Sequence, residues 1–154
     1  MAPTTLPGQV TQTSPYGRDV NTVGYPVKVC ELLSNVDGAA YLERVAVNNV
    51  KNVKNAKKAI KKAFTYQLEG KGFSLVEVIS TCPTNWGMTP DNAMKWVEDK
   101  MIPYYPLGVY KDIYADSEAG KLVRRVYFSR DSAVREYSLP ENFSHTKVLL
   151  KTKR

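Results

Sequence analysis

Hydrophobic residues form two kinds of pattern along the middle of the chain, short runs and a helical repeat. Short β-branched and apolar runs at residues 39–47 and 73–79 predict strands, the second with the composition of a buried strand. Between them, apolar residues recur every three or four positions from Val50 to Leu68, which predicts a helix. A strand, a helix and a strand of these lengths form a βαβ unit, so we expect a right-handed crossover and two parallel strands.

The helix expected at residues 50–68 has an apolar and a basic face. The apolar face consists of Val53, Ala56, Ile60, Ala63 or Phe64, and Leu68. The opposite face carries Lys51, Lys54, Lys57, Lys58, Lys61 and Lys62. We interpret the lysines as a solvated outer surface of the crossover helix. A basic amphipathic helix can also bind a membrane or an acidic protein, and this alternative stays open.

Two further helices are expected on either side of the βαβ unit. Residues 27–36 have an amphipathic pattern that stops at Asp37-Gly38, with Val29, Leu32, Leu33 and Val36 on one face. Residues 91–101 form the second helix, with Thr89 placed to cap it and Pro90 in its first turn.

The remaining segments have other patterns. Pro103 ends the second helix, and residues 102–110 read as an extended aromatic segment that faces a core or a partner chain. Farther on, residues 122–128 and 134–139 flank a turn and predict a C-terminal β-hairpin.

Residues 1–26 show no periodic apolar pattern and contain several proline and glycine residues. A long loop of this kind is functional or disordered. Its hydroxyl groups could donate hydrogen bonds to a polar ligand, and a loosely held terminal tail is the alternative.

A second polar stretch, Ser80–Gly87, follows the strand expected at 73–79. It places Cys82, Asn85 and Trp86 at the carboxyl end of a parallel strand, which is where ligands bind in open α/β sheets. An ordinary strand-to-helix turn with a buried free cysteine and a packing tryptophan is the simpler interpretation.

Composition narrows the possible classes of protein. The 154 residues, 43% hydrophobic and 24% charged, suffice for one domain or a large part of one. No apolar run approaches the roughly 20 residues that span a bilayer, so we expect no membrane partner. The net charge of +7 raises the question of nucleic acid, but no aromatic residues alternate with the lysines and we expect no such partner.

Familiar catalytic motifs are absent from the sequence. It has no nucleophile elbow, HExxH, P-loop or GxGxxG motif, and no acid–base pair stands out, so no catalytic residue or metal ligand is assigned. Cys30 and Cys82 form no CxxC pair, which fits a reducing, cytoplasmic setting. His145 lacks a nearby orienting partner in the sequence and is interpreted as structural or solvated.

Several of these segments together resemble one enzyme family. Met1–Gly8, Pro15–Arg18, Val45–Val47, the helix around Lys57-Lys58-Ala59 and above all Cys82–Gly87 look like the thiamine-diphosphate-binding β subunit of 2-oxoacid:ferredoxin oxidoreductases, of the 2-oxoglutarate or branched-chain type. The resemblance covers residues 1–112, which would be the C-terminal half of that subunit's thiamine-diphosphate-binding domain. Residues 113–154 do not match the family pattern and read as an extension that contains the hairpin and docks another subunit.

The resemblance implies oxidative decarboxylation of a 2-oxoacid with coenzyme A, giving an acyl-CoA and reduced ferredoxin. It implies thiamine diphosphate and magnesium in the full subunit, and an iron–sulfur cluster in a partner subunit or in ferredoxin. The implied protein partners are an alpha subunit, the other oxidoreductase subunits and ferredoxin. Thr4, Thr5 and Cys82 would lie near thiamine diphosphate.

One departure from the family pattern concerns magnesium. The family's Gly-Asp-Gly…Asn motif, which holds the metal and the diphosphate, lies upstream of a Met-Ala-Pro-Thr-Thr segment with which this sequence begins. The main ligands are therefore expected to be missing here. The resulting fold class is α/β, a part of a parallel-sheet domain with a βαβ core, whose remaining strands come from elsewhere. A non-catalytic half-domain that assembles with an acidic protein is the alternative function.

Overall fold

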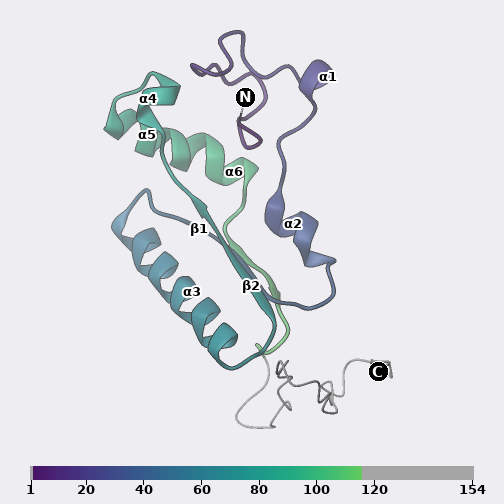
Figure 1. Cartoon of the computed structure of the whole chain (residues 1–154). Coiled ribbons are helices and arrows are strands. Elements are labelled where there is room, and N and C mark those ends of the chain that lie inside the picture. The colour runs from purple at the N-terminus through teal and green to yellow at the C-terminus, as the bar shows by residue number, and fades with distance from the viewer. Residues whose placement is uncertain (1, 116–154) are drawn as a thin grey trace, which may run out of the picture.

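The structure is a computed structural model that describes residues 2–115, and its centre is a three-stranded mixed sheet (Figure 1). Strands β1 (Ala39–Ala46) and β2 (Phe73–Ile79) are parallel, and β3 (Gly108–Asp112) pairs antiparallel with β1. The order β2-β1-β3 makes β1 the central strand, and it is buried at seven of its eight positions. The α/β class and the parallel βαβ core predicted from the sequence are confirmed.

Helix α3 (Val50–Leu68) connects β1 to β2 with the bounds expected from its periodicity. Asn49 caps it, because the side-chain oxygen of Asn49 accepts a hydrogen bond from the Asn52 backbone N–H at 2.8 Å. The helix turns a stripe of small residues to the sheet: Ala56 and Ala59 are buried beside the partly buried Val76 of β2.

The predicted apolar face of α3 is confirmed at the buried Ala56 and the partly buried Val53 and Ala63, and is wrong at its bulkier positions. Ile60, Phe64 and Leu68 are 40%, 66% and 83% exposed. Alanines at 56 and 59 allow the helix axis to approach the sheet closely, and this contact leaves the bulkier side chains on the flank of the helix. The lysine face is outward as expected, apart from Lys62, which pairs with Asp112 of β3.

Strand β2 is less buried than its composition predicts. Ile79 is its only buried residue, while Phe73 and Val78 are 50% and 40% exposed. The physical reason is its position, because β2 lies at one edge of the sheet formed by the described residues.

Helix α2 (Val29–Ser34) also differs from expectation in its buried face. Cys30 is fully buried, whereas Leu32 is 65% exposed. The helix packs against the face of the sheet opposite α3, since Glu77 of β2 accepts a hydrogen bond from the Cys30 backbone N–H while its neighbour Val76 packs beneath α3. Figure 1 shows α2 and α3 on the two sides of the strands.

Five short helical segments complete the described part of the chain. They are α1 (Val20–Val23), α4 (Pro83–Trp86), α5 (Pro90–Trp96), the π-helical turn η1 (Val97–Met101) and α6 (Ile102–Tyr104). Thr89 caps α5 with its side chain, as predicted. The proline at 103 does not end the helical run, which continues from η1 through Ile102 into α6.

The segment expected to be extended at residues 102–110 is therefore helical up to Tyr104, and Gly108–Asp112 forms β3 rather than an unpaired strap. The hairpin predicted at residues 122–139 and His145 lie outside the described residues.

Candidate functional site

Two polar loops meet at the end of the sheet where β2 finishes. The backbone N–H of Gln12 donates to the carbonyl oxygen of Asn85 at 2.8 Å. Below this contact, Trp86 packs against an apolar cluster that includes Leu6 and Ile79. The N-terminal segment and the Ser80–Gly87 loop therefore come together at this edge of the sheet.

The N-terminal segment owes its shape to one arginine. Arg18 is 7% exposed, and its guanidinium donates to the carbonyl oxygens of Gly24, Ala2 and Tyr25 at 2.8, 3.1 and 3.1 Å. It also donates to the carbonyl of Thr5 at 3.3 Å. Because a guanidinium has five N–H donors, it can join peptide groups that no regular secondary structure links. The segment is thus an ordered loop wrapped around Arg18.

Two buried polar groups in this loop have no hydrogen-bond partner among the described residues: Gln9 Nε2 and Ser14 Oγ. Gln9 and Ser14 are only 6% and 3% exposed, and Gln9 Oε1 accepts from the Leu6 N–H at 2.9 Å. Buried donors without partners are uncommon in folded proteins. These two side chains are therefore candidate binding groups, which sequence reasoning missed.

The residues predicted to lie near a cofactor occupy different surroundings. Thr5 is buried, Thr4 is partly buried, and the Thr4 carbonyl oxygen accepts a hydrogen bond from Tyr105 Oη at 3.2 Å. Cys82 is exposed at the start of α4, so the simpler expectation of a buried thiol was wrong at this position. The loops that carry these residues are brought together, and their role toward a cofactor remains a prediction.

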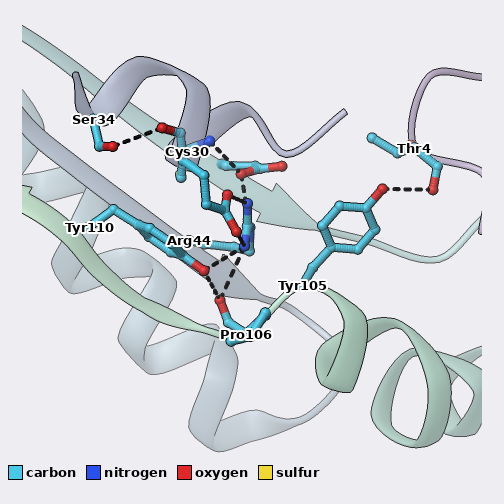
Figure 2. Close-up of polar contacts among 9 residues, drawn as sticks. Thr4, Cys30, Ser34, Arg44, Tyr105, Pro106 and Tyr110 are labelled. Carbon is cyan, nitrogen blue, oxygen red and sulfur yellow. Dashed lines mark hydrogen bonds and ion pairs between the residues drawn. The ribbon is translucent and has the colours of Figure 1, made fainter. Parts of the chain in front are cut away.

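Strand β1 carries a fully buried arginine, Arg44, near its carboxyl end (Figure 2). Its Nε lies 2.9 Å from Glu77 Oε2, and its Nη1 donates to Glu31 Oε1 at 3.0 Å. Nη1 is also 2.6 Å from the hydroxyl of Tyr110. One guanidinium therefore joins α2, β1, β2 and β3.

Electrostatics in this cluster favour the ion pairs. Burial by itself would lower the pKa of Arg44, but the hydrogen bonds to Glu31 and Glu77 outweigh it and hold the pKa above its ordinary value. The same contact holds the pKa of Glu31 below its ordinary value. Burial raises the pKa of the neighbouring Cys30 thiol to about 12, so this thiol is not a nucleophile at neutral pH.

The Arg44 cluster also reaches the N-terminal loop. The guanidinium carbon of Arg44 lies 5.3 Å from the ring centroid of the buried Tyr105, whose hydroxyl donates to Thr4 O. Sequence reasoning missed Arg44. The available signal was a charged residue inside an apolar strand, with the glutamate Glu77 at its register partner on β2.

No group of three or more histidine, cysteine, aspartate or glutamate side chains lies close enough to hold an ion between residues 2 and 115. A cleft of about 390 Å³ runs between α3 and β3, lined by Lys58, Lys62 and Val109, but it is away from the two loops. The loops therefore fit the wall of a polar ligand site, without the ligands for a metal.

Relatives with known names match most of this chain. The ketoisovalerate oxidoreductase subunit VorA of Methanothermobacter thermautotrophicus is 40% identical over 143 residues, which is 92% of this chain and 30% of the relative. The 2-oxoglutarate synthase subunit KorB of Methanocaldococcus jannaschii is 30% identical over 75% of this chain and 43% of the relative. The KorB subunit of Archaeoglobus fulgidus is 32% identical over 99 residues.

The chain belongs to the 2-oxoacid:ferredoxin oxidoreductase family. Its relatives carry the names of two different subunits, VorA and KorB, so these names do not assign the chain to one type of subunit. The chain spans about 30% of the length of the VorA relatives. Because 92% of the chain is matched, the similarity extends beyond residue 112 into the segment that the sequence resemblance left out.

Other comparisons add nothing to this family assignment. No family model matches the chain, and no solved structure matches it. Within the part of the chain that the structure describes, no helix has the length and apolar character needed to cross a membrane.

Proposed function

We propose that this chain supplies one wall of the thiamine-diphosphate site in a 2-oxoacid:ferredoxin oxidoreductase. The observation that carries the proposal is the junction of the Arg18 loop with the Ser80–Gly87 loop, marked by the Gln12–Asn85 hydrogen bond. The junction lies at the carboxyl end of β2, the end at which open α/β sheets bind ligands. The reaction proposed for this site is that of the 2-oxoacid:ferredoxin oxidoreductase family.

The chain's own groups act by binding and positioning. Gln9 Nε2 and Ser14 Oγ are buried donors that have no partner among residues 2–115, and they would bind polar atoms of the cofactor or of a neighbouring chain. Thr4, Thr5 and Cys82 would line the same wall. Trp86, packed on the cluster of Leu6 and Ile79, would exclude water from behind it.

Thiamine diphosphate, when bound, provides the carbanion chemistry by which a 2-oxoacid loses carbon dioxide. Coenzyme A would accept the acyl group and ferredoxin the electrons. Magnesium and the diphosphate would be held by residues outside those described, since no three histidine, cysteine, aspartate or glutamate side chains cluster to hold an ion among residues 2–115. An alpha subunit and other oxidoreductase subunits would complete the enzyme, in the cytoplasm.

The outward row of exposed lysines on α3 suits an acidic electron-transfer protein. Lys51, Lys54, Lys57, Lys58 and Lys61 are all exposed. Opposite charge on a redox partner would speed encounter and make it sensitive to salt. This observation also supports the second candidate function, a non-catalytic half-domain that binds an acidic partner through α3.

The direct experiment reconstitutes the chain with the remaining subunits and measures reduction of ferredoxin that depends on 2-oxoacid and coenzyme A. Ser14→Ala should raise the thiamine diphosphate concentration needed for half-maximal activity by about tenfold, because it removes a donor. Thr13→Ala, at an exposed neighbouring position, should change it less than twofold. A reconstituted complex that forms but shows no such activity would favour the non-catalytic alternative.

A second measurement concerns the full chain by itself. Titration with thiamine diphosphate and magnesium in a calorimeter should show no micromolar binding, because the metal ligands lie elsewhere. Micromolar binding would contradict the division of the site between this chain and other residues.

A further inference from the structure

We infer that the cleft between α3 and β3 binds an acidic segment of a partner protein by taking up one of its apolar side chains. The cleft is lined by Asn55, Lys58 and Lys62 on α3, by Glu43 on β1 and by Val109 on β3. Its volume of about 390 Å³ lies within the range of ligand sites in proteins. The inference rests on the proposed contact between α3 and an acidic protein, and it adds an anchor that charge alone does not provide.

Helix α3 carries a positive charge that its own residues do not balance. Its 19 residues include six lysines and no aspartate, glutamate or arginine. Lys62 pairs with Asp112, and it is the only one of the six that forms an ion pair with another described residue. Lys54 and Lys58 are four residues apart, and like charges at this spacing destabilise a helix. An acidic partner would relieve this repulsion.

Helix geometry separates the lysines at the rim of the cleft from the others. The ion pair of Lys62 with Asp112 marks the flank of α3 that faces β3. At 3.6 residues per turn, Lys51 and Lys58 lie about 20° and 40° around the helix from Lys62, whereas Lys57 lies about 140° away. Lys51 and Lys58 are exposed and about 10 Å apart along the helix axis. An extended segment spans this distance with about three residues, so two of its carboxylates can pair with these lysines.

The inner part of the cleft favours an uncharged group. Val109 is 55% exposed and is the register partner of Glu43, so both side chains lie on the α3 face of the sheet. The Glu43 carboxylate accepts a hydrogen bond from the Tyr41 hydroxyl and would repel a carboxylate or phosphate of a ligand. An aliphatic side chain would instead pack on Val109. The carboxylates of the partner would therefore stay at the rim, beside the lysines.

Nucleic acid and a second copy of the chain fit this cleft less well. Helix α3 offers no arginine for bidentate binding of phosphate, and the Tyr41 ring is only 1% exposed, so it cannot stack on a base. The net charge of +7 makes a second copy of the chain a poor source of an acidic segment. An acidic segment of another protein is the occupant that these observations favour.

The test uses the full chain and, as the probe, a fluorescein-labelled peptide with one leucine between two runs of four glutamates. Fluorescence anisotropy gives its dissociation constant at low ionic strength, and we expect the binding to weaken as salt is added. A second peptide, with serine in place of leucine, should bind about fivefold more weakly, because serine cannot bury apolar surface against Val109.

Two matched pairs of variants locate the contact. Lys58→Glu should weaken binding of the leucine peptide roughly tenfold, while Lys57→Glu, at the neighbouring exposed lysine away from the cleft, should weaken it less than about threefold. Val109→Asp should abolish the difference between the two peptides. Val36→Asp, at a position just after α2 that is 47% exposed, should retain that difference. Circular dichroism would verify that all four variants fold.

The inference is overturned if the leucine peptide does not bind, if both lysine variants weaken it equally, or if single-stranded DNA of the same charge binds more tightly. A dimer of the chain that Val109→Asp dissociates would also overturn it, since a second copy would then occupy the cleft. Salt-dependent binding without a preference for leucine would exclude the cleft and leave α3 as a contact for an acidic protein. These measurements concern binding by the chain alone, so they are independent of the reconstituted activity that tests the thiamine-diphosphate site.

Discussion

The two faces of the sheet are held together by opposite kinds of interaction. On the α2 face, Arg44 is fully buried and paired with Glu31 and Glu77, and its charge is neutralised within the protein. On the α3 face, the contact is made by the small Ala56 and Ala59 and by the ring of Tyr66, which packs against Tyr41 of β1. The first face depends on a few strong, directional contacts, and the second on close approach.

This difference means that the α2 face is a completed surface, whereas the flank of α3 is an exposed one. The α2 face satisfies its buried charges, so it needs no further partner to hold its ion pairs. The α3 face leaves Ile60 and Phe64 exposed at its flank, beside the bare edge of β2. We therefore expect substitutions on the α2 face to act on the stability of the chain itself, and those at the α3 flank to act on assembly.

Arg44→Met should have the largest effect on stability. It leaves Glu77, whose side chain is 13% exposed, without its cation, and breaking a buried pair from one side costs about 3–5 kcal/mol. The measurement is the free energy of unfolding of the full chain in urea. The double variant Arg44→Met, Glu77→Leu should recover part of the loss. If the single variant were as stable as the parent, the cluster would not hold the α2 face.

Ala59→Leu tests the close approach of α3. Ala59 is 2% exposed, and added methylene groups in a packed interface cost about 1–3 kcal/mol. Ile60→Leu, at the exposed neighbouring position, should change the free energy of unfolding by less than about 0.5 kcal/mol. Equal effects of the two substitutions would mean that α3 does not pack through its alanine stripe.

Sequence reasoning succeeded where local signals decide the outcome. The bounds of α3 follow from the cap at Asn49 and from the period of the apolar residues, and Thr89-Pro90 marks the start of α5. The parallel pairing of β1 and β2 was predicted from the order strand, helix, strand. These features depend on neighbours in the sequence or on topology.

Sequence reasoning failed where the burial of a side chain depends on contacts with residues distant in the sequence. Hydrophobicity predicts Ile60 and Phe64 on the buried face of α3 together with Ala56, yet of these three only Ala56 is buried. Arg44 was not singled out, because its partners Glu31 and Glu77 are 13 and 33 residues away in the sequence. Likewise, the sequence does not show that Gln9 Nε2 and Ser14 Oγ are buried without a hydrogen-bond partner among the described residues, because this depends on how the loop folds.

Tyr105→Phe tests the connection between the α2 face and the N-terminal loop. It removes the hydrogen bond to Thr4 O, worth about 0.5–1.5 kcal/mol, while the ring stays beside Arg44. Residues 2–26 should become more sensitive to protease, with little change elsewhere. Tyr16→Phe, at a fully exposed position, is the control and should change nothing. Unchanged protease sensitivity in Tyr105→Phe would show that the loop is held by Arg18 alone.

Glu31→Gln should have the smallest effect, confined to one range of pH. The Arg44 hydrogen bond holds the folded-state pKa of Glu31 below its ordinary value of 4.5, so ionised Glu31 stabilises the fold. That contribution is fully present above pH 4.5 and is lost as the pH falls through the folded-state pKa. The parent chain should therefore be more stable than Glu31→Gln at pH 6, and the gap should narrow toward pH 3. The free energy of unfolding of both proteins across this range is the measurement. A gap that stays constant with pH would mean that the Glu31–Arg44 contact contributes by shape alone, and that the charge on the α2 face resides in the Arg44–Glu77 pair.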